Sequence, residues 1–445
     1  MVLDLPRDLS EEVMVLDLPR DLSEEVRSRI PLTSVRKVRS TCKKWNTLSK
    51  HSFVAKKKVV LDLPRDLSEE VLSRIPLTSV RRVTSICKKW NTLSKNSFVA
   101  KKHLSREAEK AKEEFMVVVM MDYSVYLMGV NLSNKDVESC SLKLQGKLIF
   151  PHDSDSDQID VCKVYHCDGL LLCVSKDHTR LVVWNPYCGK PLWIEAPHRV
   201  EGYTGYLYAM GYDKSSNSHK ILRFRDYGPV SDDFSIYDLG SDSMNSWRDL
   251  DITPPGWRVE YMHSGVSVNG NAYWLATEDD RDLDEAEDEK TFLLSFDFTR
   301  ETFGPMLPLP FQHFPRDTVS LSPVRGGKLA ALFQPWDTLQ VEIWVTSKIE
   351  PDAVSWESEV FLSVSLKQSI YPMFQFMVTG GSFFIDEDKK VALVFDEDYY
   401  HRPVSNLAFI IGVDGSVKEV DLGETAHKNL PPLACSYLPS LIQPN

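Results

Sequence analysis

The spacing of apolar residues changes once along the chain, close to residue 115. Before that point apolar residues recur at helical intervals, as in Leu67, Val71 and Ile75, which fall on one face of a helix. After it, short runs rich in Val, Ile, Leu and Phe are separated by Gly, Asp, Asn and Pro, which is typical of strands joined by turns. The pattern predicts an α+β multidomain protein, in which a helical N-terminal part precedes an all-β domain.

The all-β part carries a repeat. Large aromatic residues recur at spacings of 54, 56 and 53 residues, at Trp193, Trp247, Phe303 and Trp356. Turn-forming glycines precede strands at Gly169, Gly211, Gly270, Gly327 and Gly381. The predicted strands include 169–174, 181–184, 220–224, 234–237, 272–275, 292–296, 341–345, 383–385, 391–395 and 407–411. A period near 50 residues is that of kelch repeats, so a kelch-like β-propeller of about six blades is predicted, with a pair of large sandwiches as the alternative.

The helical part is duplicated. The block VLDLPRDLSEEV occurs at residues 2–13, 15–26 and 60–71, and residues 15–57 match residues 60–102 at 38 of 43 positions. Each copy predicts a small three-helix module with too little core to be robust alone, which suits a module that docks onto a partner. The predicted boundaries are a degenerate copy at 1–58, the working module at 59–102, a charged helical linker at 103–114 and the β domain at 115–442.

The third copy resembles an F-box of the plant type. Its Leu63-Pro64, Glu70-Val71-Leu72, Arg74-Ile75-Pro76 and Ile86-Cys87-Lys88-x-Trp90 follow the pattern of that family. The resemblance implies docking onto an Skp-family adaptor and, through it, onto a cullin scaffold. The adaptor-binding positions that it implies are Leu63, Pro64, Val71, Leu72, Ile75, Pro76, Ile86 and Trp90.

The β domain resembles the F-box-associated domain (type 1) that follows the F-box in a large plant family. The phrases that carry this resemblance are CDGLLLC at 167–173, VWNP at 183–186, GYD at 211–213, NGNAYW at 269–274 and EIW at 342–344. The resemblance implies a substrate-recognition subunit of an Skp-cullin-F-box ubiquitin ligase, which is not itself an enzyme. An interaction scaffold without ligase coupling is the alternative, and a sugar-binding propeller is a third.

Charge, apolar run length and cysteine content limit the classes of partner and the cell compartment that we expect. Up to residue 114 the chain has 25 Lys and Arg against 16 Asp and Glu, whereas the rest has 27 against 48. An acidic β domain disfavours nucleic acid, because binding phosphates needs Lys and Arg. The longest apolar run, residues 115–121, is too short to span a bilayer. Eight cysteines without a secretory signal indicate reduced thiols, and hence the cytoplasm or the nucleus.

The sequence shows no motif of hydrolysis or nucleotide use, so no catalytic residue and no cofactor is expected. Cys162, His166, Cys167 and Cys173 lie close together, but without the spacing of a zinc site, and no metal is expected. The target protein is unknown. Loops at one end of a propeller are expected to bind it, with candidate segments 199–206, 254–261, 278–289 and 398–401. The candidate residues within and beside them are Tyr203, Tyr206, Trp257, Arg258 and Tyr399.

Overall fold

A computed structural model divides the chain into two compact units, residues 1–107 and 108–445. The residues that the structure describes belong to the second unit: 114–133, 136–148, 159–186, 191–197, 206–225, 234–240, 246–252, 256–259, 264–278, 290–367, 370, 372–377, 381–398, 404–425, 431–440 and 442–444. Both predicted F-box copies, and with them the eight predicted adaptor-binding residues, lie outside this range. Within it, no helix is long and apolar enough to cross a lipid bilayer.

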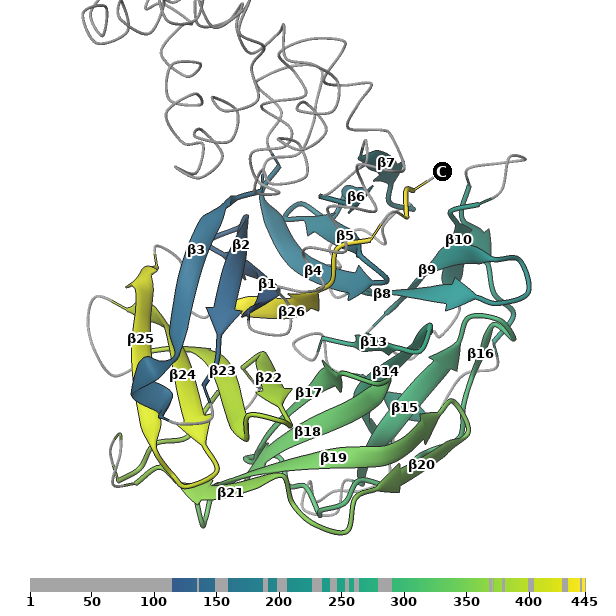
Figure 1. The fold of residues 1–445 in the computed structure, drawn as a ribbon. Coiled ribbons are helices and arrows are strands. Elements are labelled where there is room, and N and C mark those ends of the chain that lie inside the picture. The colour runs from purple at the N-terminus through teal and green to yellow at the C-terminus, as the bar shows by residue number, and fades with distance from the viewer. Residues whose placement is uncertain are drawn as a thin grey trace, which may run out of the picture. The chain divides into compact units, whose positions relative to one another are not determined.

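Six antiparallel sheets surround a common axis, which confirms the predicted six-bladed propeller (Figure 1). From the innermost strand outward, the first blade contains β26 (Leu433–Tyr437), β1 (Glu114–Met121), β2 (Ser124–Asn131) and β3 (Ser141–Lys147), with the short 3₁₀ helix η1 (Val137–Ser139) between the last two. The second blade contains β4 (Val161–Cys167), β5 (Leu170–Ser175), β6 (Arg180–Trp184) and β7 (Leu192–Glu195). The third contains β8 (Tyr206–Asp213), β9 (Ser218–Arg225), β10 (Ser235–Asp238) and β11 (Arg248–Asp249).

The fourth and fifth blades each have an edge built from two short strands. In the fourth, β12 (Trp257–Arg258) and β13 (Val266–Val268) both pair with β14 (Asn271–Glu278), followed outward by β15 (Thr291–Asp297) and β16 (Thr302–Phe303). In the fifth, β17 (Thr318–Val324) and β18 (Lys328–Gln334) precede β19 (Gln340–Glu350), which pairs with both β20 (Ala353–Trp356) and β21 (Leu362–Ser365). The sixth blade contains β22 (Phe383–Asp386), β23 (Val391–Glu397), β24 (Ser405–Gly412) and β25 (Val417–Glu424).

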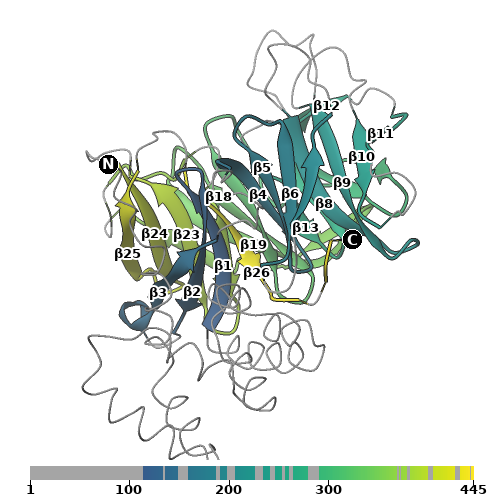
Figure 2. The ribbon, with the colours of Figure 1, turned by 90° about the horizontal axis from the view of Figure 1, so that it is seen from above.

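The ring is closed by the C-terminal strand. β26 pairs with β1 in an antiparallel register that runs from Met116↔Tyr437 to Met120↔Leu433. Figures 1 and 2 show the two strands side by side. The first blade therefore combines the two ends of the domain, and β26 covers an edge of β1 that would otherwise have unpaired backbone groups.

The repeat read from the sequence corresponds to one blade. The predicted strands coincide with observed strands to within one residue at their starts or fall inside them. Trp193, Phe303 and Trp356 lie in the outermost strands β7, β16 and β20, and Trp247 directly precedes the outermost strand β11. The aromatic period arises because each of these four blades ends with a large ring, and Trp247, Phe303 and Trp356 pack against the core shared with the preceding blade.

Two glycines of the repeat, Gly211 and Gly381, have a different role from the one predicted. Neither has a positive φ, and a Cβ atom on Gly381 would come within 2.1 Å of the Phe395 carbonyl oxygen. Gly169, Gly270 and Gly327 lie in turns with φ of 85°, 83° and 74°, as expected. Gly211, however, lies inside β8, where a Cβ atom would come within 2.1 Å of the Phe298 ring and 2.6 Å of the Gly270 carbonyl oxygen. Any side chain at position 211 is therefore excluded by the close approach of the neighbouring blade, and not by turn geometry.

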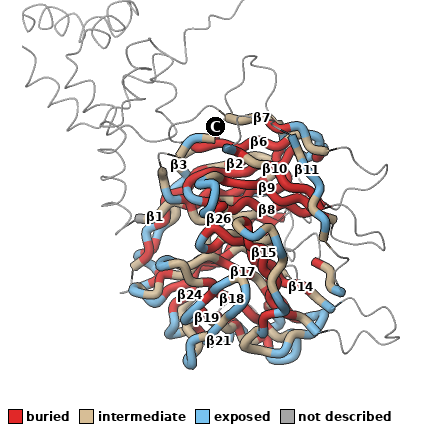
Figure 3. Tube along the Cα trace, turned by 90° about the vertical axis from the view of Figure 1, so that its right-hand side faces the viewer, coloured by how far each residue is buried: buried red, intermediate tan, exposed pale blue. Residues whose placement is uncertain are grey.

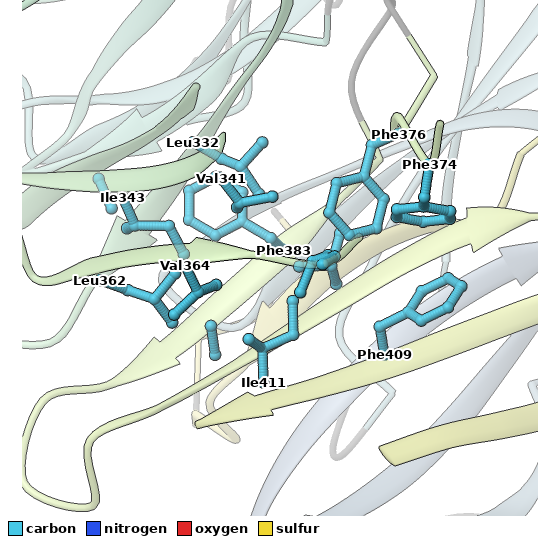
Figure 4. Packing of buried hydrophobic residues seen from close by; sticks show 14 of the residues in the cluster. Leu332, Val341, Ile343, Leu362, Val364, Phe374, Phe376, Phe383, Phe409 and Ile411 are labelled. Atoms are coloured by element: carbon cyan, nitrogen blue, oxygen red, sulfur yellow. The ribbon is translucent and has the colours of Figure 1, made fainter. Parts of the chain in front are cut away.

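The core lies between adjacent blades. Figure 3 shows the buried residues along the middles of the strands, with exposed residues at the turns and outer edges. Between the fifth and sixth blades, Val341, Ile343 and Phe383 pack against Phe409 and Ile411 (Figure 4). Each fully buried apolar side chain of this size contributes about 1.5–3 kcal/mol, so the packed blades hold the loops at both ends of the propeller in place.

Candidate functional site

The propeller has two ends that differ in what they carry. Glu114, where the described chain begins, and Tyr437, the last residue of β26, lie at one end, here called the proximal end. The turn at residues 122–123 and Leu433, the first residue of β26, lie at the opposite, distal end. Turns that follow inner strands meet those of the next blade at the proximal end, as where the Tyr212 N–H donates to the Gly270 carbonyl at 2.9 Å.

The four segments predicted to bind a target are attached at the distal end. Segments 199–206 and 254–261 precede the inner strands β8 and β13, and segments 278–289 and 398–401 follow β14 and β23. Because neighbouring strands in a blade are antiparallel, the strand ends that flank these segments lie at the distal end. Tyr203, Tyr399 and most of these segments lie outside the described residues, so their role in binding stays a prediction.

Tyr206 is a core residue, which corrects its prediction as a binding residue. It is the first residue of β8 and only 2% exposed. The guanidinium carbon of Arg223, itself 1% exposed, lies 3.7 Å from the centroid of the Tyr206 ring. Interface residues must be reachable by a partner, and the ring of Tyr206 is already covered by its own domain.

Trp257 and Arg258 are half-buried neighbours in β12, which pairs with the distal end of β14. The Trp257 ring packs edge to face against Phe303, with ring centroids 4.8 Å apart, and against Phe224 at 6.4 Å. Replacing Trp257 would therefore weaken core packing as well as any binding. Arg258 is the cleaner probe of the predicted binding role.

A second group of exposed residues at the distal end was missed by the sequence analysis. Phe314, Trp336 and Met373 are 43%, 48% and 70% exposed. The guanidinium carbon of Arg316 lies 5.4 Å from the centroid of the Trp336 ring. These residues come from the segment before β17, the loop between β18 and β19, and the segment before β22. We call Phe314, Arg316, Trp336 and Met373 the Trp336 platform.

A buried carboxylate joins two of the three segments. Asp317 is 1% exposed, and its two oxygens accept the backbone N–H groups of Phe314 at 2.8 Å and Trp336 at 3.0 Å. Charge-assisted bonds of this kind are shorter and stronger than those between neutral groups. Asp317 therefore fixes the backbone at two of the platform residues.

Amide side chains tie in the third segment. Gln334, fully buried, donates to the Phe374 carbonyl at 3.0 Å and accepts the Phe376 N–H at 2.9 Å. Gln375 donates to the Arg316 carbonyl at 2.8 Å. Phe374 and Phe376 point into the core between the fifth and sixth blades (Figure 4). Met373 is thus exposed on a segment whose next residues are anchored inside.

The sequence did contain a signal for the platform. Each exposed apolar residue adjoins a proline, in Phe314-Pro315, Pro335-Trp336 and Pro372-Met373. The stretches FPRD and QPWD also interrupt the strand pattern with aromatic and charged side chains, as the four predicted segments do. Only the structure shows that these distant stretches belong to one surface.

We expect Asp317→Ala to loosen the platform and to lower the free energy of unfolding by about 1–2 kcal/mol, because two backbone donors lose their acceptor. Denaturant unfolding of the full chain measures the loss, and amide hydrogen exchange at Phe314 and Trp336 should become faster. Asp337→Ala is the matched control, since the exposed Asp337 carboxylate accepts only the neighbouring Thr338 N–H among the hydrogen bonds that the structure records. Equal exchange rates in both variants would contradict the role given to Asp317.

The inner strands line a small cavity along the axis, with a volume of about 80 Å³. Its lining includes Tyr165, Ser264, Ser320 and Ser436. Near it, Lys163 of β4 lies with Nζ 3.4 Å from the Ser264 oxygen, and burial lowers the pKa of Lys163 to about 8. The cavity has room for about five to eight water molecules, so it suits solvent that bridges the inner strands.

Cys167, Asp168 and His219 bring three potential metal ligands within 4.8 Å of one another at the proximal end. Asp168 Oδ2 lies 3.2 Å from His219 Nε2 and 3.7 Å from Cys167 Sγ, so hydrogen bonds link the three groups. Burial, and then the charge of Asp168, raise the pKa of Cys167 well above its usual value, which keeps the thiol a neutral donor. We interpret the cluster as a bridge between the second and third blades. Of the four residues considered for zinc in the sequence, only Cys167 belongs to this cluster. His219 could not be grouped with them because it comes from another blade.

Comparison with known proteins extends over both parts of the chain. The family of F-box associated beta propeller domains matches residues 116–444, and the F-box domain family matches residues 15–56 and 60–101. F-box protein At3g19470 of Arabidopsis thaliana is 55% identical over 455 residues, which cover 99% of this chain and 100% of the relative. F-box/kelch-repeat protein At3g16740 of the same plant is 48% identical over 464 residues, with 99% of each chain covered.

Proposed function

The chain belongs to the family of plant F-box proteins that carry an F-box associated β-propeller domain, and from this membership we propose that it is the substrate-recognition subunit of an Skp-cullin-F-box ubiquitin ligase. The observation that supports this most is the joining of an F-box to a propeller in one chain. The F-box would hold the Skp-family adaptor and its cullin, while the propeller would hold a target protein. We place this activity in the cytoplasm or the nucleus.

The proposed mechanism is proximity. A target held on the propeller would meet the ubiquitin-charged enzyme of the same complex at a high effective concentration, so a lysine of the target is modified without any bond chemistry by this chain. Within the propeller, the loops of the distal end are the candidates for holding the target.

We propose that the copy at 60–101 is the one that binds the adaptor. The copy at 15–56 has Arg27 where the other has Leu72, and Thr41 where the other has Ile86. Burying a cation or an unpaired hydroxyl at an apolar contact costs on the order of one to several kcal/mol. The earlier copy therefore offers a weaker apolar surface.

Deleting residues 1–58 is expected to leave adaptor binding intact, whereas Leu63→Ala with Pro64→Ala in the full chain should abolish it. Co-purification with an Skp-family adaptor and cullin measures both results. Circular dichroism of the double variant should keep the β-sheet signal, because the change lies outside the unit that contains the propeller.

Two single changes make the test sharper. Leu72→Arg should prevent adaptor binding. The reverse change in the other copy, Arg27→Leu, is made in the Leu63/Pro64 double variant and should not restore adaptor binding there. Restored binding would show that the copy at 15–56 can also dock. Loss of adaptor on deleting residues 1–58, with retention in Leu72→Arg, would assign docking to the other copy. Absence of adaptor from all variants and from the unaltered chain would leave the propeller as an interaction scaffold without ligase coupling.

A further inference from the structure

We infer that the Trp336 platform is a docking site for a segment of the target in which a large apolar side chain lies close to a carboxylate. This inference deepens the proposed function, and it rests on that function for the identification of the ligand as a target protein. The platform comprises Phe314, Arg316, Trp336 and Met373, all at the distal end.

The apolar residues of the platform are gathered, which is unusual for a surface. Seven large hydrophobic residues are exposed within the described part of the chain, and three of them are Phe314, Trp336 and Met373. The hydrogen bonds of Asp317 and Gln334 bring the three segments that carry them together. Scattered apolar residues need no explanation, but a gathered group at a loop end marks an interaction site.

The platform is held ready before any partner arrives. A proline adjoins each of the three apolar residues and limits the freedom of the backbone there. Asp317 fixes the first two segments, and the buried Phe374 and Phe376 anchor the third (Figure 4). Ordering loops and side chains is a main cost of binding, so a surface fixed in advance binds more tightly.

The residue types indicate a protein as the partner. Trp, Phe, Met and Arg are enriched at the centres of protein interfaces, and Trp and Arg are prominent among the residues whose loss weakens binding most. Met373 adds a flexible side chain that adapts to the shape of an apolar partner. A segment of a target with at least one large apolar side chain meets these residues best.

The charge of the platform indicates a carboxylate in that segment. Arg316 is exposed and makes no ion pair with any residue that the structure describes; its recorded side-chain contact is the Trp336 ring. The adjacent Asp317 is buried, and its two oxygens accept backbone N–H groups, so it makes no ion pair with Arg316. A carboxylate of the partner would pair with the guanidinium through two hydrogen bonds while its apolar neighbour covers the Trp336 ring.

The net negative charge of the domain does not argue against a target segment that carries a carboxylate. Residues 115–445 carry 27 Lys and Arg against 48 Asp and Glu. Charges farther apart than about 8 Å are largely screened at physiological ionic strength, so contact with Arg316 decides the local preference. The negative charge of the whole domain instead repels an acidic segment as it approaches. Salt screens this repulsion, so we expect salt to raise the association rate of the segment.

The test uses the full chain purified with an Skp-family adaptor and a displayed library of random peptides of 12 residues. Peptides retained by the unaltered chain should place Asp or Glu near Leu, Ile, Phe, Met, Trp or Tyr. Trp336→Ala should weaken the binding of these peptides at least about tenfold. Arg316→Glu should exchange the enriched acids for Lys and Arg while the apolar preference remains.

Leu144→Ala serves as the matched control, because Leu144 is 55% exposed on β3, away from the platform. It should leave peptide binding unchanged. Melting temperatures of all variants should agree within about 3 °C, which shows that the changes are local. If Trp336→Ala unfolds the domain, the charge exchange in Arg316→Glu still decides the matter.

Four results would overturn the inference: no retained peptides, equal binding to Trp336→Ala, no acidic preference, or self-association of the chain that Trp336→Ala removes. Adaptor retention is scored in the same samples. Peptide binding without adaptor would contradict only the proposed ligase function, whereas adaptor binding without peptide selection would contradict only the platform.

Discussion

Deleting residues 431–445, which contain β26, is expected to abolish cooperative unfolding of the propeller. β26 is the innermost strand of the first blade and pairs with β1 over five residues. Without it, the backbone of Val117, Val118 and Val119, all completely buried, faces solvent along one edge. An exposed apolar edge both loses hydrogen bonds and pairs with other chains, so we expect aggregation.

The measurement is thermal unfolding of the full chain followed by circular dichroism, together with the soluble fraction after expression. The control is a chain that lacks only residues 444–445, which keeps the bonds from Asn185 Nδ2 to the carbonyls of Ser440 and Ile442 at 3.0 and 2.7 Å. That chain should unfold as the intact one does. A cooperative transition in the chain without β26 would show that the ring closes by another route.

Much of the propeller could be predicted because each blade has a local signature. Strands such as β15 and β23 are short runs of apolar residues, and the ring at the outer edge of a blade recurs once per repeat, as with Phe303 and Trp356. The closure could not be predicted in this way. It joins β26 to a strand more than 300 positions earlier, and the sequence LACSY of β26 resembles any other short strand.

Gly211 shows the same limit at a single residue. Its place in the sequence resembles that of the turn glycines, but the reason for a glycine there is the Phe298 ring of the next blade. The local pattern records only that a small residue is required. The neighbour that requires it comes from a residue 87 positions later in the chain, and the fold is needed to bring the two together.

The segments predicted to bind a target could be named from the sequence, whereas the exposure of their residues could not. The rule that binding residues lie in loops that interrupt the strands led to the distal end, where the Trp336 platform also lies. Residue type alone could not distinguish Tyr206 from Trp336. Tyr206 stacks on the buried Arg223 between blades, while Trp336 follows Pro335 in a loop and stays 48% exposed. The exposure of a side chain depends on the residues that pack around it in the fold. It therefore cannot be predicted from the positions of aromatic residues in the sequence.

Raising the pH from about 5 to about 8 is expected to destabilise the propeller through Asp396 by about 2.5 kcal/mol. Asp396, at the distal end of β23, is 3% exposed, and burial raises its pKa to about 7. Its pKa in the unfolded chain is about 3.9. Between these values the folded protein keeps a proton that the unfolded chain has released, so this contribution is largest at low pH and is lost as the pH rises through 7.

Asp396→Asn should remove this pH dependence and separate it from the titration of other groups. The carboxyl oxygens accept the N–H groups of Met377 at 3.0 Å and Glu397 at 2.8 Å, and an amide can accept only one of them, which costs about 1 kcal/mol at every pH. Denaturant unfolding should therefore find the unaltered chain more stable at pH 5 and the variant at least as stable at pH 8. Parallel stability curves would contradict the assignment.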